Sequence, residues 1–235
     1  MSKSNRPGEA LESEPAPIET KLTEKMRQDM SDAEKKEETD EGRFPIAGDR
    51  LIIEADPRNI GAVVVAQNTK ERLYRMINGF HEAGDLLAKQ SEVAPFNCNL
   101  LYPAIFAYRQ SLELRLKYFL MACGPLAGEL PYFRDHDLSE LWSKCKRMYL
   151  SFEGRSEPAD NETFQVVENL FAEFMRIDPG SDAFRFAHDR KGQAVVLNIQ
   201  TVDLRNLRET LCALHNFLEC LDCQLKYGHD ITPLA

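Results

Sequence analysis

Three charged residues repeat at four-residue spacing within the apolar stretch 102–120. Arg109, Glu113 and Lys117 lie there among leucines and aromatic residues. On a helix, residues four apart share one face, so these side chains would line up beside a hydrophobic core. A charge in such a place must be paired, hydrogen-bonded or functional, because burial alone costs free energy. The spacing therefore predicts a polar centre close to the core.

Two later segments, HDLSELW (136–142) and FRFAHD (184–189), add polar groups to this centre. The candidate anion- or partner-binding set is Arg109, Glu113, Lys117, His136, Asp137, Arg185, His188 and Asp189. In one interpretation these residues converge into a pocket for phosphate or another anion. In the other, Glu113 pairs with its helix neighbours, Asp137 caps the next helix, and Arg185 is an ordinary strand charge.

The elements that must position these groups are mostly helical. Residues 1–44 are rich in charged and small polar residues, and we expect an acidic disordered tail there. Residues 45–235 are expected to form the folded domain. Capping patterns and apolar periodicity predict helices over about 68–90, 103–121, 137–148, 161–176 and 203–227. Alternation and a turn predict a β-hairpin over 184–199, and 51–55 and 62–67 are β-branched stretches that either pair or extend into the first helix. The fold class is mainly α: a four- to five-helix bundle with a small hairpin before the last helix.

Composition limits the function classes. A formal net charge of -9 argues against broad nonspecific DNA binding, which needs a basic face. The polar first residues lack an apolar signal region, and no apolar run is long enough to span a bilayer. We therefore expect a cytoplasmic protein whose six cysteines are reduced. Cys220 and Cys223 have a spacing used for zinc, but no matching second pair is near, so no metal is expected.

The order of three segments resembles the HEPN superfamily of helical domains, especially its prokaryotic members. The segments are SLELRLKYFL (111–120), HDLSELW and FRFAHD. Members of that superfamily often carry a glutamate four residues before a lysine on the second helix, then a His-Asp-Leu entry to the next helix. The resemblance covers about residues 68–225.

This resemblance implies a helical bundle, usually dimeric, of the kind found in toxin–antitoxin and antiviral systems. Some members are metal-independent ribonucleases, and others act as binding or assembly modules. We expect a non-catalytic interaction module; the alternatives are an endoribonuclease and a nucleotide- or anion-sensing domain. The implied partners are a second copy of the chain, a co-encoded protein, and RNA or a nucleotide. No cofactor and no membrane partner is expected.

Active members carry an arginine, four to six intervening residues, and then a histidine. Arg208 and His215 have this spacing, and so do Arg75 and His81. Positions seven apart lie about 20° apart around a helix, so Arg208 and His215 would share the polar side of the last helix. Such an arginine would stabilise a developing phosphorane while the histidine transfers protons. The alternative is a solvated helix face. Arg185 and His188, with the second-helix charges, form another catalytic candidate.

Overall fold

The computed structural model describes residues 44–93, 98–124, 135–154, 158, 160–189 and 191–229. The chain divides into two compact units, Met1–Val64 and Val65–Ala235, which are described separately below. The predicted tail, apart from Phe44, lies outside the described residues.

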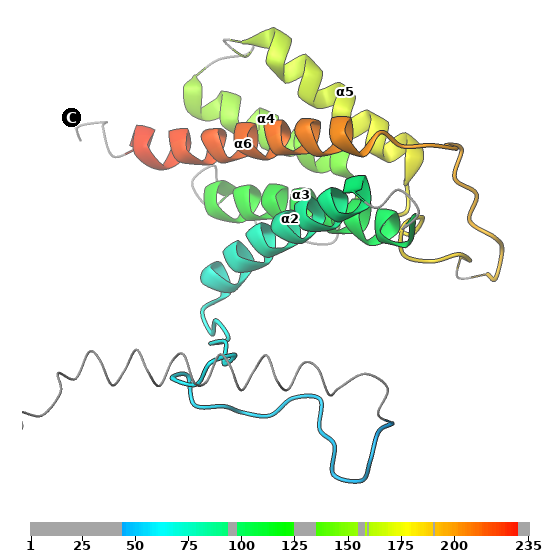
Figure 1. Cartoon of the computed structure of the whole chain (residues 1–235). Helices are drawn as coiled ribbons and strands as arrows, with labels where there is room; N and C mark the ends of the chain where they lie inside the picture. Colours follow the sequence, from blue (N-terminus) through cyan, green and yellow to red (C-terminus); the bar gives the residue numbers. More distant parts are fainter. Residues whose placement is uncertain are drawn as a thin grey trace, which may run out of the picture. The chain divides into compact units, whose positions relative to one another are not determined.

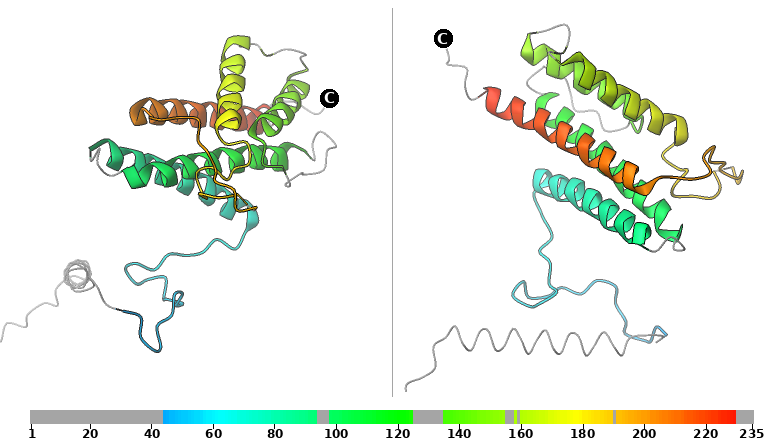
Figure 2. Two further views of the ribbon diagram at one scale, coloured as in Figure 1. Left: turned by 90° about the vertical axis from the view of Figure 1, so that its right-hand side faces the viewer. Right: turned by 45° about the horizontal axis from the view of Figure 1, so that its top comes forward.

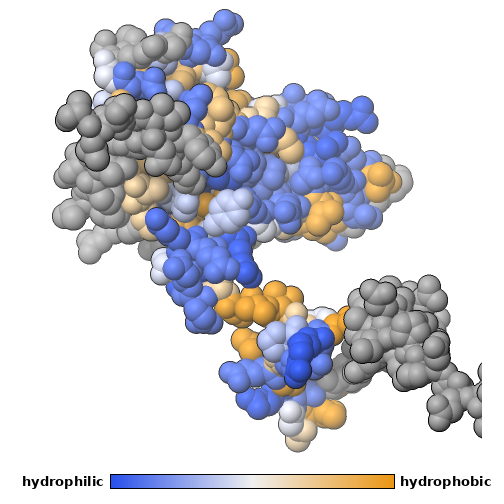
Figure 3. Space-filling view, turned by 90° about the vertical axis from the view of Figure 1, so that its left-hand side faces the viewer, coloured by the Kyte–Doolittle hydropathy of each residue, from blue (hydrophilic) through white to orange (hydrophobic). Residues whose placement is uncertain are grey.

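The described part of the first unit, residues 44–64, is an extended chain with turns. The DPRN sequence (56–59), which separates the two β-branched stretches, forms a turn, since the Asn59 amide donates to the Asp56 carbonyl at 2.9 Å. The β-branched stretches 51–55 and 62–67 contain no strand and do not pair. Their large apolar side chains are exposed, and Figure 3 shows hydrophobic groups between hydrophilic ones over this segment. The unit therefore lacks a hydrophobic core in its described part.

The second unit is a helical bundle, as predicted (Figure 1). Its described helices are α2 (Thr69–Val93), α3 (Leu101–Cys123), α4 (Leu138–Glu153), α5 (Asn161–Ile177) and α6 (Leu204–His229), with a short 3-10 turn, η1 (Cys98–Leu100). The central helix is α3, which packs against α2, α4 and α6, while α5 packs against α4. In Figure 2, α6 lies between α2 on one side and α4 and α5 on the other.

Short polar side chains begin the helices where the sequence predicted caps. The Asn68 side chain accepts from the amides of Lys70 and Glu71 at the start of α2. Asp137 accepts from two amides of α4 at 2.8 and 3.0 Å, and Asp203 accepts from one amide of α6 at 3.0 Å. Each bond satisfies an amide that has no partner within its own helix. The predicted caps are therefore confirmed.

The core forms around α3, which is buried on nearly every side. Trp142 of α4 is its largest fully buried side chain and packs against the rings of Phe164, Phe171 and Phe217. Gly84 lets α2 approach α3 closely, because a Cβ there would lie 2.9 Å from the Tyr108 ring. These contacts fix the orientation of α3, and with it the directions of its charged side chains.

The predicted β-hairpin over 184–199 is wrong. The described part of this segment contains one isolated antiparallel bridge, between His188 and Ala194, and no strand. Upstream of it, the amides of Arg185 and Phe186 donate to the Asp182 carbonyl, so the chain makes a turn there. Phe184 is consequently buried while Phe186 is 50% exposed, although both would share one face of a strand. Tertiary contacts override the local alternation.

Candidate functional site

The four-residue repeat on α3 does form a buried charged network. Glu113 is its centre: one carboxylate oxygen accepts from Lys117 Nζ at 2.8 Å and from His136 Nδ1 at 2.9 Å, and the other pairs with Arg109 Nη1 at 3.2 Å. Arg109, Glu113 and Lys117 are all buried, whereas the His136 side chain is largely exposed. The structure thus brings together four of the predicted residues.

Two further members, Asp178 and Ser181, come from the segment that follows α5. Arg109 pairs through Nε with Asp178 Oδ2 at 3.4 Å and donates to the Ser181 hydroxyl and the His136 carbonyl. Asp178 Oδ1 also accepts from the amides of Asp182 and Ala183, which turns the chain. The sequence analysis ended the fourth predicted helix at about residue 176 and did not single out the DPGSD stretch (178–182) that follows it. Its two aspartates and serine were the available signal.

Charge balance decides what this network can do. It holds two cations, Arg109 and Lys117, and two carboxylates, Glu113 and Asp178. Burial raises the pKa of Glu113, but hydrogen bonds from Lys117 and His136 outweigh it and hold that pKa below its ordinary 4.5. An incoming anion would compete with both carboxylates for buried cations. The network therefore has a structural role: it holds together α3, the entry to α4 and the 178–183 segment. It is named the clamp.

The other members of the predicted set lie outside this clamp. Asp137 caps α4. The Arg185 guanidinium stacks over the rings of Phe106 and Phe186, at 5.4 and 4.8 Å from their centroids. His188 and Asp189 are exposed, and Asp189 Oδ1 accepts from the amides of the turn that follows it. These residues do not form one pocket with Glu113.

Arg208 and His215 are placed differently from the sequence interpretation. Arg208 donates through Nε to Glu92 at 3.0 Å and lies 3.7 Å from Asp85, so two carboxylates of α2 neutralise it. His215 is buried instead of lying on a polar helix side. Its ring stacks on His81 of α2, with centroids 4.0 Å apart and planes 15° from parallel.

The histidine pair contacts a second buried arginine, Arg115 of α3. Arg115 Nη2 donates to His215 Nε2 and to Asn78 Oδ1, each at 3.3 Å. A guanidinium can only donate, so His215 Nε2 is the acceptor and its neutral ring carries the proton on Nδ1. Among the residues that the structure describes, no carboxylate pairs with Arg115, and its Nε has no hydrogen-bond partner. This group of Arg115, His81 and His215 is named the histidine cluster.

The histidine cluster favours neutral imidazoles. Burial, then the neighbouring His81 and Arg115, lowers the pKa of His215 to about 4. Burial is also the largest cause of the lowered pKa of His81. At neutral pH both rings are therefore proton acceptors next to a buried cation. The sequence did not single out Arg115, but both arginine-to-histidine spacings end on histidines that meet in space, which was a usable signal.

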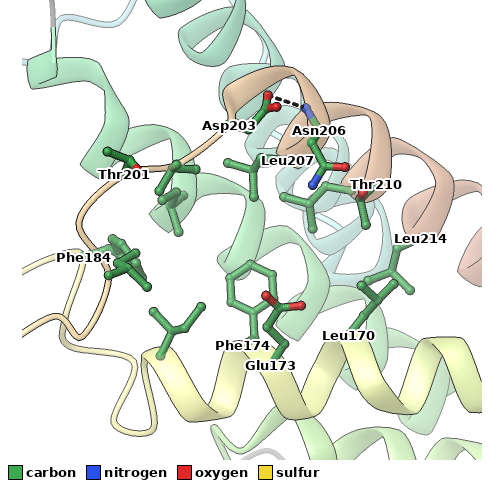
Figure 4. Close-up of a pocket in the computed structure, with 15 residues that line it drawn as sticks. Leu170, Glu173, Phe174, Phe184, Thr201, Asp203, Asn206, Leu207, Thr210 and Leu214 are labelled. Atoms are coloured by element: carbon green, nitrogen blue, oxygen red, sulfur yellow. Dashed lines mark hydrogen bonds between the residues drawn. The ribbon is translucent and has the colours of Figure 1, made fainter.

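A separate cavity of about 310 Å³ lies between α5, α6 and the segment before α6 (Figure 4). Its walls are mostly apolar and come from α3, α5, α6 and residues 184–202. Glu173, Thr201, Asp203, Asn206 and Thr210 supply its polar groups. No residue of the clamp or of the histidine cluster lines it. The cavity is therefore a third, independent feature.

Metal-binding clusters and membrane-spanning helices are both absent from the described residues. There, no group of three or more histidine, cysteine, aspartate or glutamate side chains is arranged to hold a metal ion. Cys220 and Cys223 are exposed thiols near the end of α6. Within the same ranges, no helix combines the length and the apolarity needed to cross a membrane.

No family model, characterised protein or solved structure gives a significant match to this chain.

Proposed function

We propose that the chain is a HEPN-like helical interaction module of a bacterial toxin–antitoxin or antiviral defence system, and that it has no catalytic role of its own. The clamp supports this proposal. It joins Glu113 of the SLELRLKYFL segment to His136 of the HDLSELW segment, two of the three segments that carry the resemblance. Because Arg109, Glu113 and Lys117 are buried and their charges are paired, the clamp stabilises the bundle, and we place the function on the surface.

The outer face of α2 is the surface best suited to association with a second copy. Positions 76, 79, 83, 86, 90 and 93 are spaced three and four apart, as in a heptad seam. Met76, Leu86 and Val93 are 41%, 67% and 76% exposed, while the opposite face of α2 is buried against the bundle. This row of residues is named the α2 seam. A helix of a soluble protein that exposes such a row has an unburied apolar face.

Gly79 in the α2 seam is a second reason to expect that two copies associate through α2. Glycine within a helix costs about 1 kcal/mol relative to alanine. Gly84 is required because a Cβ there would meet the Tyr108 ring, but among the described residues nothing lies within 4 Å of a Cβ at Gly79. Packing among those residues therefore does not explain Gly79. Close approach of a second α2 helix does, since a missing side chain lets two backbones come together.

Substitution of Leu86 by lysine is expected to weaken self-association by about 100-fold. A two-fold interface loses both buried leucines at once, which amounts to about 3 kcal/mol. Gly79→Leu is expected to weaken the dimer without lowering the thermal stability of the monomer, because the added side chain has open space within the chain. Sedimentation equilibrium over a concentration series measures both effects.

The matched control is Val166→Lys, which changes a valine that is 51% exposed on α5. It should leave the dimer constant unchanged. A dimer that withstands both α2 variants would show that another surface is used. A wild-type chain that is monomeric throughout, and that binds no protein encoded beside it when the two are co-expressed, would contradict the interaction module itself.

The histidine cluster favours a second candidate function, metal-independent RNA cleavage. The neutral ring of His81 can take the proton of a ribose 2′-hydroxyl, whereas His215 can do so only after its Nε2 gives up the hydrogen bond from Arg115. The Arg115 guanidinium, which has no carboxylate partner among the described residues, can stabilise a phosphorane. Arg208, which two carboxylates neutralise, does not fit this role.

If the histidine cluster is catalytic, the purified chain will cleave single-stranded RNA in the presence of a chelator and leave cyclic phosphate ends. His81→Ala and His215→Ala should then each reduce the rate by about 100-fold or more. Arg208→Ala should have a much smaller effect. Gel analysis of end-labelled RNA measures the rate, and intact RNA at high protein concentration, with and without a co-encoded partner, would exclude this activity.

A further inference from the structure

The cavity lies between α5 and α6. At one end the two helices meet, since the rings of Phe164 and Phe217 pack edge to face with centroids 5.5 Å apart. Beyond this contact α5 packs on α4, and α6 packs on α2, α3 and α4. The opening between Phe174 of α5 and Leu207 of α6 is the cavity (Figure 4). Ile105 of α3 contributes to its lining.

The size and walls of the cavity are those of a small-molecule site. Its volume of about 310 Å³ lies at the lower end of the range of ligand pockets, about 300–1,000 Å³. Leucine, isoleucine, valine and phenylalanine side chains make most of the lining, with a few polar groups among them. A ligand with an apolar body would remove this surface from water, which is the main source of affinity in such sites.

The charged groups of the cavity are both negative. Glu173 projects from α5 toward the space between the helices, and Asp203 lies across from it at the start of α6 (Figure 4). Asp203 also caps α6 through the Asn206 amide. Among the described residues, Glu173 has no hydrogen bond or ion pair, and no lysine, arginine or histidine lines the cavity. This charge favours a cationic group and opposes phosphates and carboxylates.

We propose that the cavity binds an amphipathic organic cation: an amine that carries one ring or a branched aliphatic body. The apolar body occupies the space between Phe174 and Leu207, and the ammonium group pairs with Glu173 at the opening. The hydroxyls of Thr201 and Thr210 are available to the remaining ammonium protons. The proposal is independent of self-association through the α2 seam and of RNA cleavage.

Three probes with the same body and different end groups test this. 4-Phenylbutylamine is cationic at neutral pH, 4-phenylbutanol is neutral and 4-phenylbutyrate is anionic. Isothermal titration of the full chain should give a dissociation constant for the amine of about 1 mM or lower, with the alcohol several-fold weaker and the carboxylate at least about tenfold weaker. Equal binding of amine and carboxylate, or no binding of any probe up to about 5 mM, would overturn the proposal.

Variants locate the site and identify the charge. Glu173→Gln keeps the shape of the side chain and should remove the preference for the amine over the alcohol. Leu170→Phe and Thr210→Phe fill the cavity from α5 and α6 and should each weaken all three probes; two positions are used in case one variant fails to fold. Glu209→Gln, an exposed α6 glutamate outside the cavity, is the control. Amine binding that persists unchanged in the filled variants or in Glu173→Gln would refute this site.

Discussion

Replacement of Glu113 by alanine is expected to lower the free energy of unfolding by about 3–5 kcal/mol, the largest effect of any single substitution proposed for this chain. The variant leaves Arg109 and Lys117 buried with only Asp178 to neutralise them. A buried charge without its partner retains its full desolvation cost. Urea unfolding followed by circular dichroism measures the change, and Glu113→Gln, which keeps one carbonyl acceptor, should lose less.

A matched control separates burial from pairing. Glu71 also pairs with an arginine four residues later on its helix, but both side chains are half exposed. Glu71→Ala should therefore cost less than about 1 kcal/mol. The double variant Glu113→Leu with Lys117→Met should recover part of the stability lost in Glu113→Leu alone, because it removes one of the buried cations. If Glu113→Ala unfolds within about 1 kcal/mol of the wild type, the clamp does not stabilise the bundle.

Local signals in the sequence were sufficient for the helices and insufficient for the segment before α6. Asn68, Asp137 and Asp203 each cap a helix through bonds to amides within three residues, so the cause lies in the sequence window itself. The hairpin prediction failed because the turn after Asp182 depends on Asp178, which also holds Arg109 of α3. A contact between residues so far apart in the chain leaves no periodic pattern.

The candidate sites also differ in how far local sequence signals could predict them. The line of Arg109, Glu113 and Lys117 was predictable, because four-residue spacing on one helix places side chains together. For the histidine cluster the sequence singled out His81 and His215 but did not place them together, because His81, Arg115 and His215 come from three helices whose packing is set by the whole core. The two arginines of α3 also differ chemically: Glu113 and Asp178 neutralise Arg109, whereas no carboxylate of the described residues pairs with Arg115.

The same histidine cluster predicts a loss of stability in mild acid. The pKa of His215 is about 4 in the folded chain and about 6.5 when the ring is exposed by unfolding. Between these values the unfolded chain binds the proton and the folded chain resists it, so the free energy of unfolding falls as the pH drops from 6.5 to 4. The shift corresponds to about 3 kcal/mol, and the lowered pKa of His81 acts in the same direction.

Urea unfolding at a series of pH values measures this loss. In His215→Gln the amide oxygen can still accept from Arg115, but it cannot be protonated in this range, so the decline between pH 6.5 and 4 should be much shallower. His188→Gln, which changes an exposed histidine, should follow the wild type. The lowered pKa of Glu113 removes stability at lower pH, as the carboxylate is protonated below its ordinary 4.5. A wild type whose stability stays level down to pH 4 would mean that His215 is not a buried neutral ring, and the catalytic role for this cluster would lose its basis.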